Sequence, residues 1–267
     1  MVRSTQRNAG FSLVELLVVV AIVVVLIGTL LPALGRARDH ANRVKCASNL
    51  RSIGHGLTAY AHQYGYYPGC YGLGGVPFAV WPVRLRPYLG GEQDVFFCPS
   101  QDERCQWVKG AAPATPADAA TSVHVALGYD AGEPVLHRER YFSYGYNSEG
   151  TSSATEARGL GHIVNQRAAW GRTQLVRTTR VRKPAAMIAI ADTVADGQWD
   201  FMISPWYEGM YPGRVHRGGA NVLFCDGHVT WHAQEELVDM RYATDNARAW
   251  EVRRMWNNDH RPAELGD

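Results

Sequence analysis

The sequence of 267 residues lacks the short motifs that mark the common classes of enzyme. It contains no Gly-x-Ser-x-Gly elbow, no His-Glu-x-x-His pair and no Gly-Lys-Ser/Thr phosphate loop. It also has no Cys-x-x-Cys pair, which argues against a zinc knuckle or a thioredoxin-like redox motif. Basic residues number 27 against 25 acidic ones, so there is no basic field that would attract nucleic acid. We therefore expect neither an enzyme nor a nucleic-acid-binding protein.

One segment near the start is far more apolar than the rest of the chain. All but five of the 24 residues from 11 to 34 are apolar. A helix of that length is about 36 Å long, enough to cross the ~30 Å hydrocarbon core of a bilayer. A soluble core helix would need an apolar partner on every side, and the apolar region of a removable secretory signal is normally only about 7–15 residues long. The segment therefore predicts a membrane-spanning helix.

A carboxylate, Glu15, lies inside this apolar segment. A charge at the centre of a bilayer costs about 2.5–3.5 kcal/mol on insertion scales, so such a residue normally has a function. In a helix that begins near Phe11, Glu15 falls in the first turn, where the helix dipole favours an anion. Cleavage after Gly10 would also create an ammonium group at Phe11, within reach of the carboxylate on the same or a neighbouring helix.

The polar leader 1–10 contains two arginines, and the segment that follows it reads Gly10-Phe11-Ser12-Leu13-Val14-Glu15. Together they resemble the class III signal of type IV pilins and type II secretion pseudopilins. The resemblance implies that a prepilin peptidase cuts between Gly10 and Phe11 and methylates the new N-terminus at Phe11. It also implies that Glu15 pairs with the N-terminus of an adjacent pilin-like subunit when a filament assembles.

The charges beside the apolar segment and the resemblance imply opposite orientations. Basic residues cluster just after the segment, at Arg36, Arg38, Arg43, Lys45 and Arg51. The positive-inside rule alone would therefore place the C-terminal part in the cytoplasm, although the rule weakens for long translocated domains. The resemblance implies a single-pass protein in the lipid of the bacterial inner membrane, with its head outside the cytoplasm, and we adopt that orientation.

After Pro32 the pattern becomes amphipathic. Apolar residues recur at spacings of three and four, which is typical of one side of a helix: Cys46, Leu50, Ile53, Leu57, Tyr60 and Tyr64. We expect the helix to continue through Pro32, to be weakened by Gly54 and Gly56, and to end near Gly65.

Short strands are predicted beyond the helix. The candidates are 141–146, 175–181 and 186–191, and a hairpin in which Asp226-Gly227 forms the turn between 221–225 and 228–232. A short amphipathic helix is predicted around Ala247, Trp250 and either Met255 or Trp256.

The predicted fold class is α+β and pilin-like, with one long N-terminal helix packed on a small antiparallel sheet. The predicted divisions are a leader (1–10), a transmembrane helix half (11–34), an amphipathic helix half (35–65) and a β-rich head (66–267).

The resemblance extends into the head through four short segments. They are Cys46 with Ser48-Asn49-Leu50, Phe97-Cys98-Pro99-Ser100, Ser143-Tyr144-Gly145-Tyr146-Asn147, and His216 followed after nine residues by Asp226-Gly227. These are similar to a bacterial pseudopilin-like family that is labelled for its prepilin-type signal and its His–nine residues–Asp-Gly motif.

Two metal hypotheses compete with simpler interpretations. His216, Asp226, His228 and His232 carry ligand groups, but turn formation by Asp226-Gly227 and a local hydrogen bond from His216 account for these residues. We therefore predict no metal there. Asp192, Asp196 and Asp200 could bind Ca²⁺, but their spacing is not that of an EF-hand, and a solvated acidic loop explains them more simply. No other cofactor is expected.

Five cysteines in an exported domain allow at most two disulfides within the chain. Cys98 and Cys105 could close a small loop, or Cys46 could link the helix to the Cys98 segment. The sequence does not decide between these pairings.

These observations predict a pseudopilin-like structural subunit of a type II secretion or type IV pilus-like assembly. Its expected partners are prepilin peptidase and other pilin-like subunits that contact its N-terminal helix. The alternative is a membrane-anchored periplasmic binding module or enzyme that uses a prepilin-type export signal. A pocket with converging polar groups would favour the alternative.

Overall fold

The computed structural model describes residues 13–70, 81–107, 128–133, 141–151, 158–162, 174–238 and 246–261. The chain divides into two compact units, residues 1–41 and 42–267. Helix α1 (Leu13–Tyr64) contributes to both units, and all the other helices and strands belong to the second.

The first half of α1 leaves its apolar side chains uncovered. Among the described residues, α1 is the one helix long and apolar enough to cross a membrane, and none of its most apolar stretch is buried in the protein. The helix continues through Pro32, as predicted. Its length and unburied apolar surface are consistent with a single-pass membrane anchor.

The second half of α1 buries the predicted apolar stripe. Cys46, Leu50 and Ile53 are fully buried, whereas Tyr64, which was assigned to the same stripe, is 54% exposed. Tyr64 lies at the last turn of the helix, where its ring contacts that of Tyr60 at 4.6 Å between centroids. The helix ends there because Gly65 takes a positive φ of 71°.

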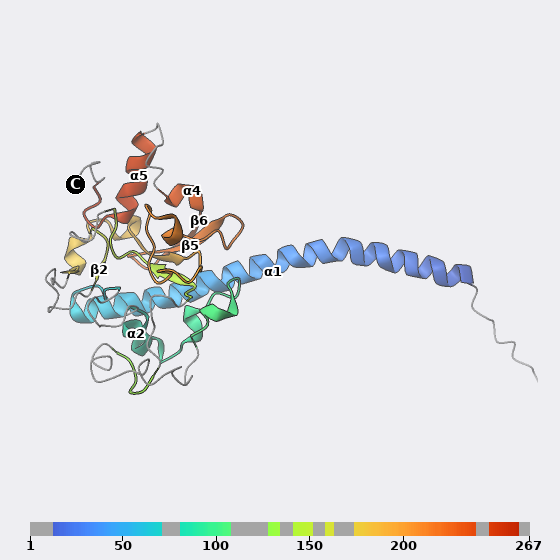
Figure 1. Ribbon diagram of the computed structural model, residues 1–267, viewed down its shortest axis with the longest axis horizontal. Helices are drawn as coiled ribbons and strands as arrows, with labels where there is room; N and C mark the ends of the chain where they lie inside the picture. The colour runs from blue at the N-terminus through green and yellow to red at the C-terminus, as the bar shows by residue number, and fades with distance from the viewer. Residues whose placement is uncertain are drawn as a thin grey trace, which may run out of the picture. The chain divides into compact units, whose positions relative to one another are not determined.

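A four-stranded antiparallel sheet lies beside this half of α1 (Figure 1), in the order β1-β4-β5-β6. Its strands are β1 (Tyr144–Tyr146), β4 (Ile188–Asp192), β5 (Gly219–Phe224) and β6 (Val229–Ala233). This arrangement confirms the predicted α+β, pilin-like fold and the hairpin at Asp226-Gly227.

Both faces of the sheet are covered along the central strands β4 and β5, whereas the edge strand β6 is partly exposed. Leu223 and Ile190 pack with the buried stripe of α1, whereas Val222 and Phe224 pack on the other side. Two helices cover that second side, α4 (Gln234–Leu237) and α5 (Asn246–Trp256), as Figure 1 shows. Because neighbouring residues of a strand point to opposite faces, β5 is buried along its whole length.

The remaining elements are short. They are α2 (Trp81–Leu85), the two-stranded pair β2 (Gly161–His162) and β3 (Gln174–Leu175), and 3₁₀ turns at Arg86–Leu89, Asp94–Phe96, Glu103–Cys105, Thr178–Arg180, Pro184–Ala186 and Glu208–Met210.

Two local predictions were wrong. The segment predicted as a strand over 175–181 keeps only the end of β3 and then forms a 3₁₀ turn. The second concerns Trp250: the predicted short helix is present as α5 with Trp256 buried, but Trp250 is 50% exposed and Val252 is buried in its place.

Candidate functional site

The N-terminal motif lies at the start of α1. Gly10 and Phe11, the predicted cleavage and methylation positions, fall outside the described residues. Glu15 is described, and it occupies the first turn of α1 with its side chain exposed. The anion therefore lies at the positive end of the helix dipole, as the sequence predicted.

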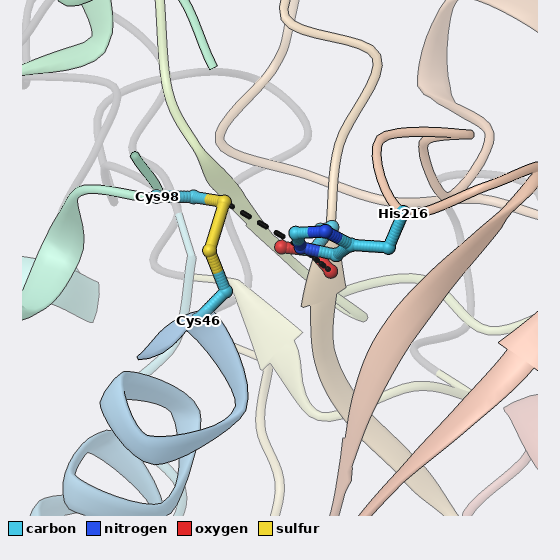
Figure 2. Close-up of side chains that lie close together, drawn as sticks. Cys46, Cys98 and His216 are labelled. Carbon is cyan, nitrogen blue, oxygen red and sulfur yellow. Dashed lines mark hydrogen bonds and ion pairs between the residues drawn. A yellow bond between two sulfur atoms is a disulfide. The ribbon is translucent and has the colours of Figure 1, made fainter. Parts of the chain in front are cut away.

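A second candidate site is buried in the head, where Cys46 of α1 forms a disulfide with Cys98 (Figure 2). Two further hydrogen bonds fix the Cys98 segment. The side-chain amide of Asn49, one turn beyond Cys46, donates to the carbonyl of Phe97 at 2.8 Å. The N–H of Cys98 donates to the hydroxyl of Ser143 at 2.9 Å. Three of the four segments that carried the resemblance therefore meet at this disulfide.

His216, from the fourth segment, lies against the same disulfide (Figure 2). Its Nε2 atom is 3.6 Å from Sγ of Cys98 and 3.4 Å from Oδ2 of Asp192. The backbone holds His216 in place, because its N–H donates to the carbonyl of Gly219 and its carbonyl accepts from the indole of Trp231. The side chains of His216 and Asp192 are both fully buried.

Asp192 ends strand β4 and reaches His216 across the start of β5. Its Oδ2 atom accepts a hydrogen bond of 2.7 Å from the N–H of Asn221. Within the described parts of the chain, Oδ1 of Asp192 and Nδ1 of His216 have no hydrogen-bond partner. A buried carboxylate is normally paired on every side or bound to a metal, so this site has unused binding capacity.

The four residues bring together two sulfurs, an imidazole nitrogen and a carboxylate oxygen. The ligand atoms of Cys46, Cys98, Asp192 and His216 all lie within 4.8 Å of one another. This set of atoms can do one of two things: the sulfurs can form a covalent link between α1 and the head, or the four atoms can coordinate a metal ion. Because all four residues are buried, the group suits a structural role better than turnover of a substrate.

The structure separates the two halves of the His–nine residues–Asp-Gly motif. Asp226-Gly227 forms the turn between β5 and β6, at the opposite end of β5 from His216. Oδ1 of Asp226 accepts from the N–H of His228 at 3.1 Å and also contacts its imidazole. His228 and His232 lie on the same side of the hairpin, where both rings contact Phe224. Among the described residues, Asp226, His228 and His232 do not belong to the group of candidate ligands that contains His216.

The three carboxylates considered for Ca²⁺ take different roles. Asp192 faces His216, whereas Asp200 accepts hydrogen bonds from the backbone N–H groups of Phe142, Asp196 and Gly197. Burial raises the pKa of the Asp200 carboxyl to about 6. Among the described residues these carboxylates do not form a group of metal ligands.

The structure resolves the question of disulfide pairing that the sequence left open. The bond joins Cys46 to Cys98, with their Cα atoms 5.2 Å apart. The alternative pairing of Cys98 with Cys105 does not occur, and Cys105 is a buried free thiol. Burial raises the pKa of Cys105 to about 12, so this thiol stays protonated at neutral pH.

Sequence reasoning missed the role of Asp192, which it assigned to an acidic loop. The signal that could have found it is topological. In an antiparallel pair the end of one strand lies beside the start of the next, so the end of β4 had to approach the residues that precede β5.

Comparison with known families covers the N-terminal two-thirds of the chain. A profile described as "Prokaryotic N-terminal methylation motif" matches residues 5–31, which include Gly10, Phe11 and Glu15. A profile described as "Protein of unknown function (DUF1559)" matches residues 35–177, which include Cys46 and Cys98. His216 and Asp226 lie beyond both matched segments. No curated protein and no solved structure matches the chain significantly.

Proposed function

The chain belongs to the family described as "Protein of unknown function (DUF1559)" and carries a prokaryotic N-terminal methylation motif, and from this premise we propose that it is a pseudopilin-like structural subunit. In this proposal, prepilin peptidase cuts between Gly10 and Phe11 and methylates Phe11. The mature protein stays in the inner membrane through α1 and joins a type II secretion or type IV pilus-like assembly. It performs no catalysis itself.

The observation that carries the proposal is the unburied apolar half of α1 within the matched motif. Monomeric soluble proteins rarely expose an apolar patch of more than a few hundred Å². In lipid the same surface is solvated by acyl chains, and in a filament it would pack against the helices of other subunits. The same surface therefore suits both the membrane-bound and the assembled state.

Glu15 gives this packing a preferred register. An acid in an apolar bundle needs a cation, and cleavage after Gly10 supplies one as the amine of Phe11 on a neighbouring subunit. Glu15 follows Phe11 by four residues, or about 6 Å along a helix, so an offset of about one turn between neighbouring subunits would bring that amine level with the carboxylate. Mismatched registers would leave the charge uncompensated in an apolar surrounding.

The Cys46–Cys98 disulfide supports the orientation in which the head lies outside the cytoplasm. Structural disulfides form and persist in oxidising compartments and are rare in the cytosol. This agrees with export of the head and opposes the orientation that the flanking basic residues alone would suggest.

The proposal is tested at the N-terminus of the mature protein. The full-length gene is expressed in its host with and without an active prepilin peptidase, and membranes are analysed by mass spectrometry of N-terminal peptides. We expect N-methyl-phenylalanine at position 11 only when the peptidase is active. A mature protein that starts at Met1, or at a residue after the apolar segment, in the presence of the peptidase would refute the proposal.

A further inference from the structure

We propose that Cys46, Cys98, Asp192 and His216 form a metal-binding site that takes Zn²⁺ when the two cysteines are reduced. The disulfide and the metal site are then two states of one cluster. In both states the cluster cross-links α1 to the head. This role is independent of whether the protein assembles into a filament.

Two distances from Nε2 of His216 match those of a tetrahedral zinc site, and the two sulfurs, bonded to each other in the oxidised state, would separate to about 3.8 Å on reduction. With Zn–S bonds of about 2.3 Å and Zn–N and Zn–O bonds of about 2.0–2.2 Å, tetrahedral ligands are about 3.6 Å apart for S and N and about 3.4 Å apart for N and O. Sγ of Cys98 and Nε2 of His216 are 3.6 Å apart. Nε2 of His216 and Oδ2 of Asp192 are 3.4 Å apart.

One unpartnered atom points to the same conclusion. Asp192 is fully buried, yet among the described residues its Oδ1 accepts no hydrogen bond, so the carboxylate has an oxygen available for a cation. Isolated polar atoms in an apolar interior are destabilising, and a bound cation would neutralise the buried carboxylate. Two sulfurs, one imidazole and one carboxylate are a ligand set that suits Zn²⁺.

The scaffold holds the ligands in place before any ion binds. Cys46 projects from α1, Asp192 ends β4, and His216 precedes β5. The N–H of Asn221 donates to Asp192, and the N–H of Cys98 donates to Ser143. Hydrogen bonds of this kind fix the orientation of metal ligands. They raise the affinity for the metal ion, because the ligands lose little conformational freedom when the ion binds.

The change of state requires a defined redox step. A dithiol reductant donates two electrons and two protons to the Cys46–Cys98 bond, each sulfur becomes a thiol, and the dithiol is oxidised to its own disulfide. Zn²⁺ then displaces the two thiol protons and forms two Zn–S bonds. His216 contributes the lone pair of Nε2 and Asp192 one carboxylate oxygen, with no further change of oxidation state.

The experiment uses full-length protein in detergent and compares its oxidised and reduced forms. Because the cluster is buried, reduction is carried out at a denaturant concentration below the unfolding transition, with Zn²⁺ or Co²⁺ as the probe, and the denaturant is then removed. We expect a single Zn²⁺ ion per reduced chain and none in the oxidised chain. We expect reduced protein with Co²⁺ to show sulfur-to-cobalt charge-transfer bands and the intense visible bands of tetrahedral Co²⁺.

Variants separate this cluster from other ligands. Asp192→Asn and His216→Ala should weaken binding by at least tenfold, since even removing an outer partner of a metal ligand costs about 10–100-fold. Cys225→Ser removes a free thiol and His228→Ala an imidazole outside the cluster, and both should bind like the wild type.

The wild-type comparison keeps the proposal falsifiable even if a cluster variant fails to fold. The proposal is overturned if reduced wild-type protein binds no more Zn²⁺ than the oxidised form. It is equally overturned if the Co²⁺ spectrum lacks sulfur charge-transfer bands, or if Cys225→Ser or His228→Ala lowers binding as much as His216→Ala.

Discussion

Gly54 of α1 lies directly against Leu223 of β5: a Cβ atom built on Gly54 would be only 2.7 Å from Cδ1 of Leu223. The same Cβ would be 3.6 Å from Cα of Gly227 in the β5–β6 turn. At the other end of the strand, the side-chain amide of Asn221 reaches the carbonyl of Arg43 at 3.4 Å. Strand β5 therefore runs alongside α1, and close approach at Gly54 sets their separation.

We expect Gly54→Ala to destabilise the head. Alanine favours a helix by about 1 kcal/mol over glycine, but forcing a methyl group into a packed interior costs about 1–3 kcal/mol. The difference is a net loss of about 0–2 kcal/mol, and because Leu223 is fully buried and has little room to move, we expect the upper part of that range. Thermal unfolding of the full-length protein in detergent measures it.

Gly209→Ala is the matched control for this substitution. Its added Cβ would meet only Oδ2 of Asp196, at an ordinary contact distance of 3.6 Å. We therefore expect little change in unfolding temperature. A Gly54→Ala protein as stable as the wild type would show that helix and strand can separate slightly, and that the approach at Gly54 does not limit their packing.

The turn between β5 and β6 needs a glycine at position 227 because of its backbone conformation. Replacing Gly227 therefore tests the Asp226-Gly227 part of the His–nine residues–Asp-Gly motif. The φ of Gly227 is +92°, and a Cβ there would meet nothing closer than the hydroxyl of Thr58 at 4.0 Å. Gly227→Ala should therefore cost about 1–2 kcal/mol of stability through backbone strain alone. Gly227→Asn should cost less, because asparagine tolerates positive φ better.

The two Gly227 variants also test whether the halves of the motif act separately. Peptide mapping under non-reducing conditions should find the Cys46–Cys98 bond intact in both, since His216 lies at the far end of β5. Loss of that bond on replacement of Gly227 would contradict this separation.

The sequence predicted the fold class well because its main determinants are local. The apolar stripe from Cys46 to Tyr60, the stop at Gly65 and the Asp226-Gly227 turn each depend on a few neighbouring residues. The prediction that Gly54 merely weakens the helix was incomplete, because the importance of this glycine depends on a residue far away in the chain. Gly54 lies against Leu223, which is 169 positions away.

The buried cluster was harder to predict from the sequence. Its four members come from α1, from the segment after a 3₁₀ turn, from the end of β4 and from the segment that precedes β5. No spacing rule connects Asp192 with His216, because strand pairing brings them together. His216 was therefore recognised as a motif residue, while Asp192 was assigned to a solvated acidic loop and the cysteines to alternative disulfide pairings.

Asp200 should make the stability of the head depend on pH. Burial raises the pKa of its carboxyl to about 6 in the folded protein, above the ordinary value of 3.8. The folded state therefore binds a proton more tightly than the unfolded state. The stabilisation from Asp200 is fully present below pH ~4 and is lost as the pH rises through about 6, by an amount on the order of 2–3 kcal/mol.

Denaturant unfolding of wild type and Asp200→Asn between pH 4 and pH 7 measures this effect. The amide of the variant does not titrate, so the stability advantage of the wild type should shrink as the pH rises. Asp94→Asn removes an exposed carboxyl and serves as the control. A difference between wild type and Asp200→Asn that does not vary with pH would show that folding does not raise the pKa of Asp200.

Glu15 should matter for assembly and not for insertion. Glu15→Ala removes a charge that costs about 2.5–3.5 kcal/mol at the bilayer centre, so membrane insertion should be at least as efficient as in the wild type. Without the carboxylate, the methylated amine of a neighbouring Phe11 loses its proposed counter-charge, and incorporation into filaments should fall. Glu15→Asp keeps the charge and should restore part of it, whereas Val14→Ala, one position away, should behave like the wild type. Immunoblots of the membrane and sheared-filament fractions measure how much of each variant is inserted and how much is incorporated into filaments. Normal incorporation of Glu15→Ala would contradict the role proposed for this residue.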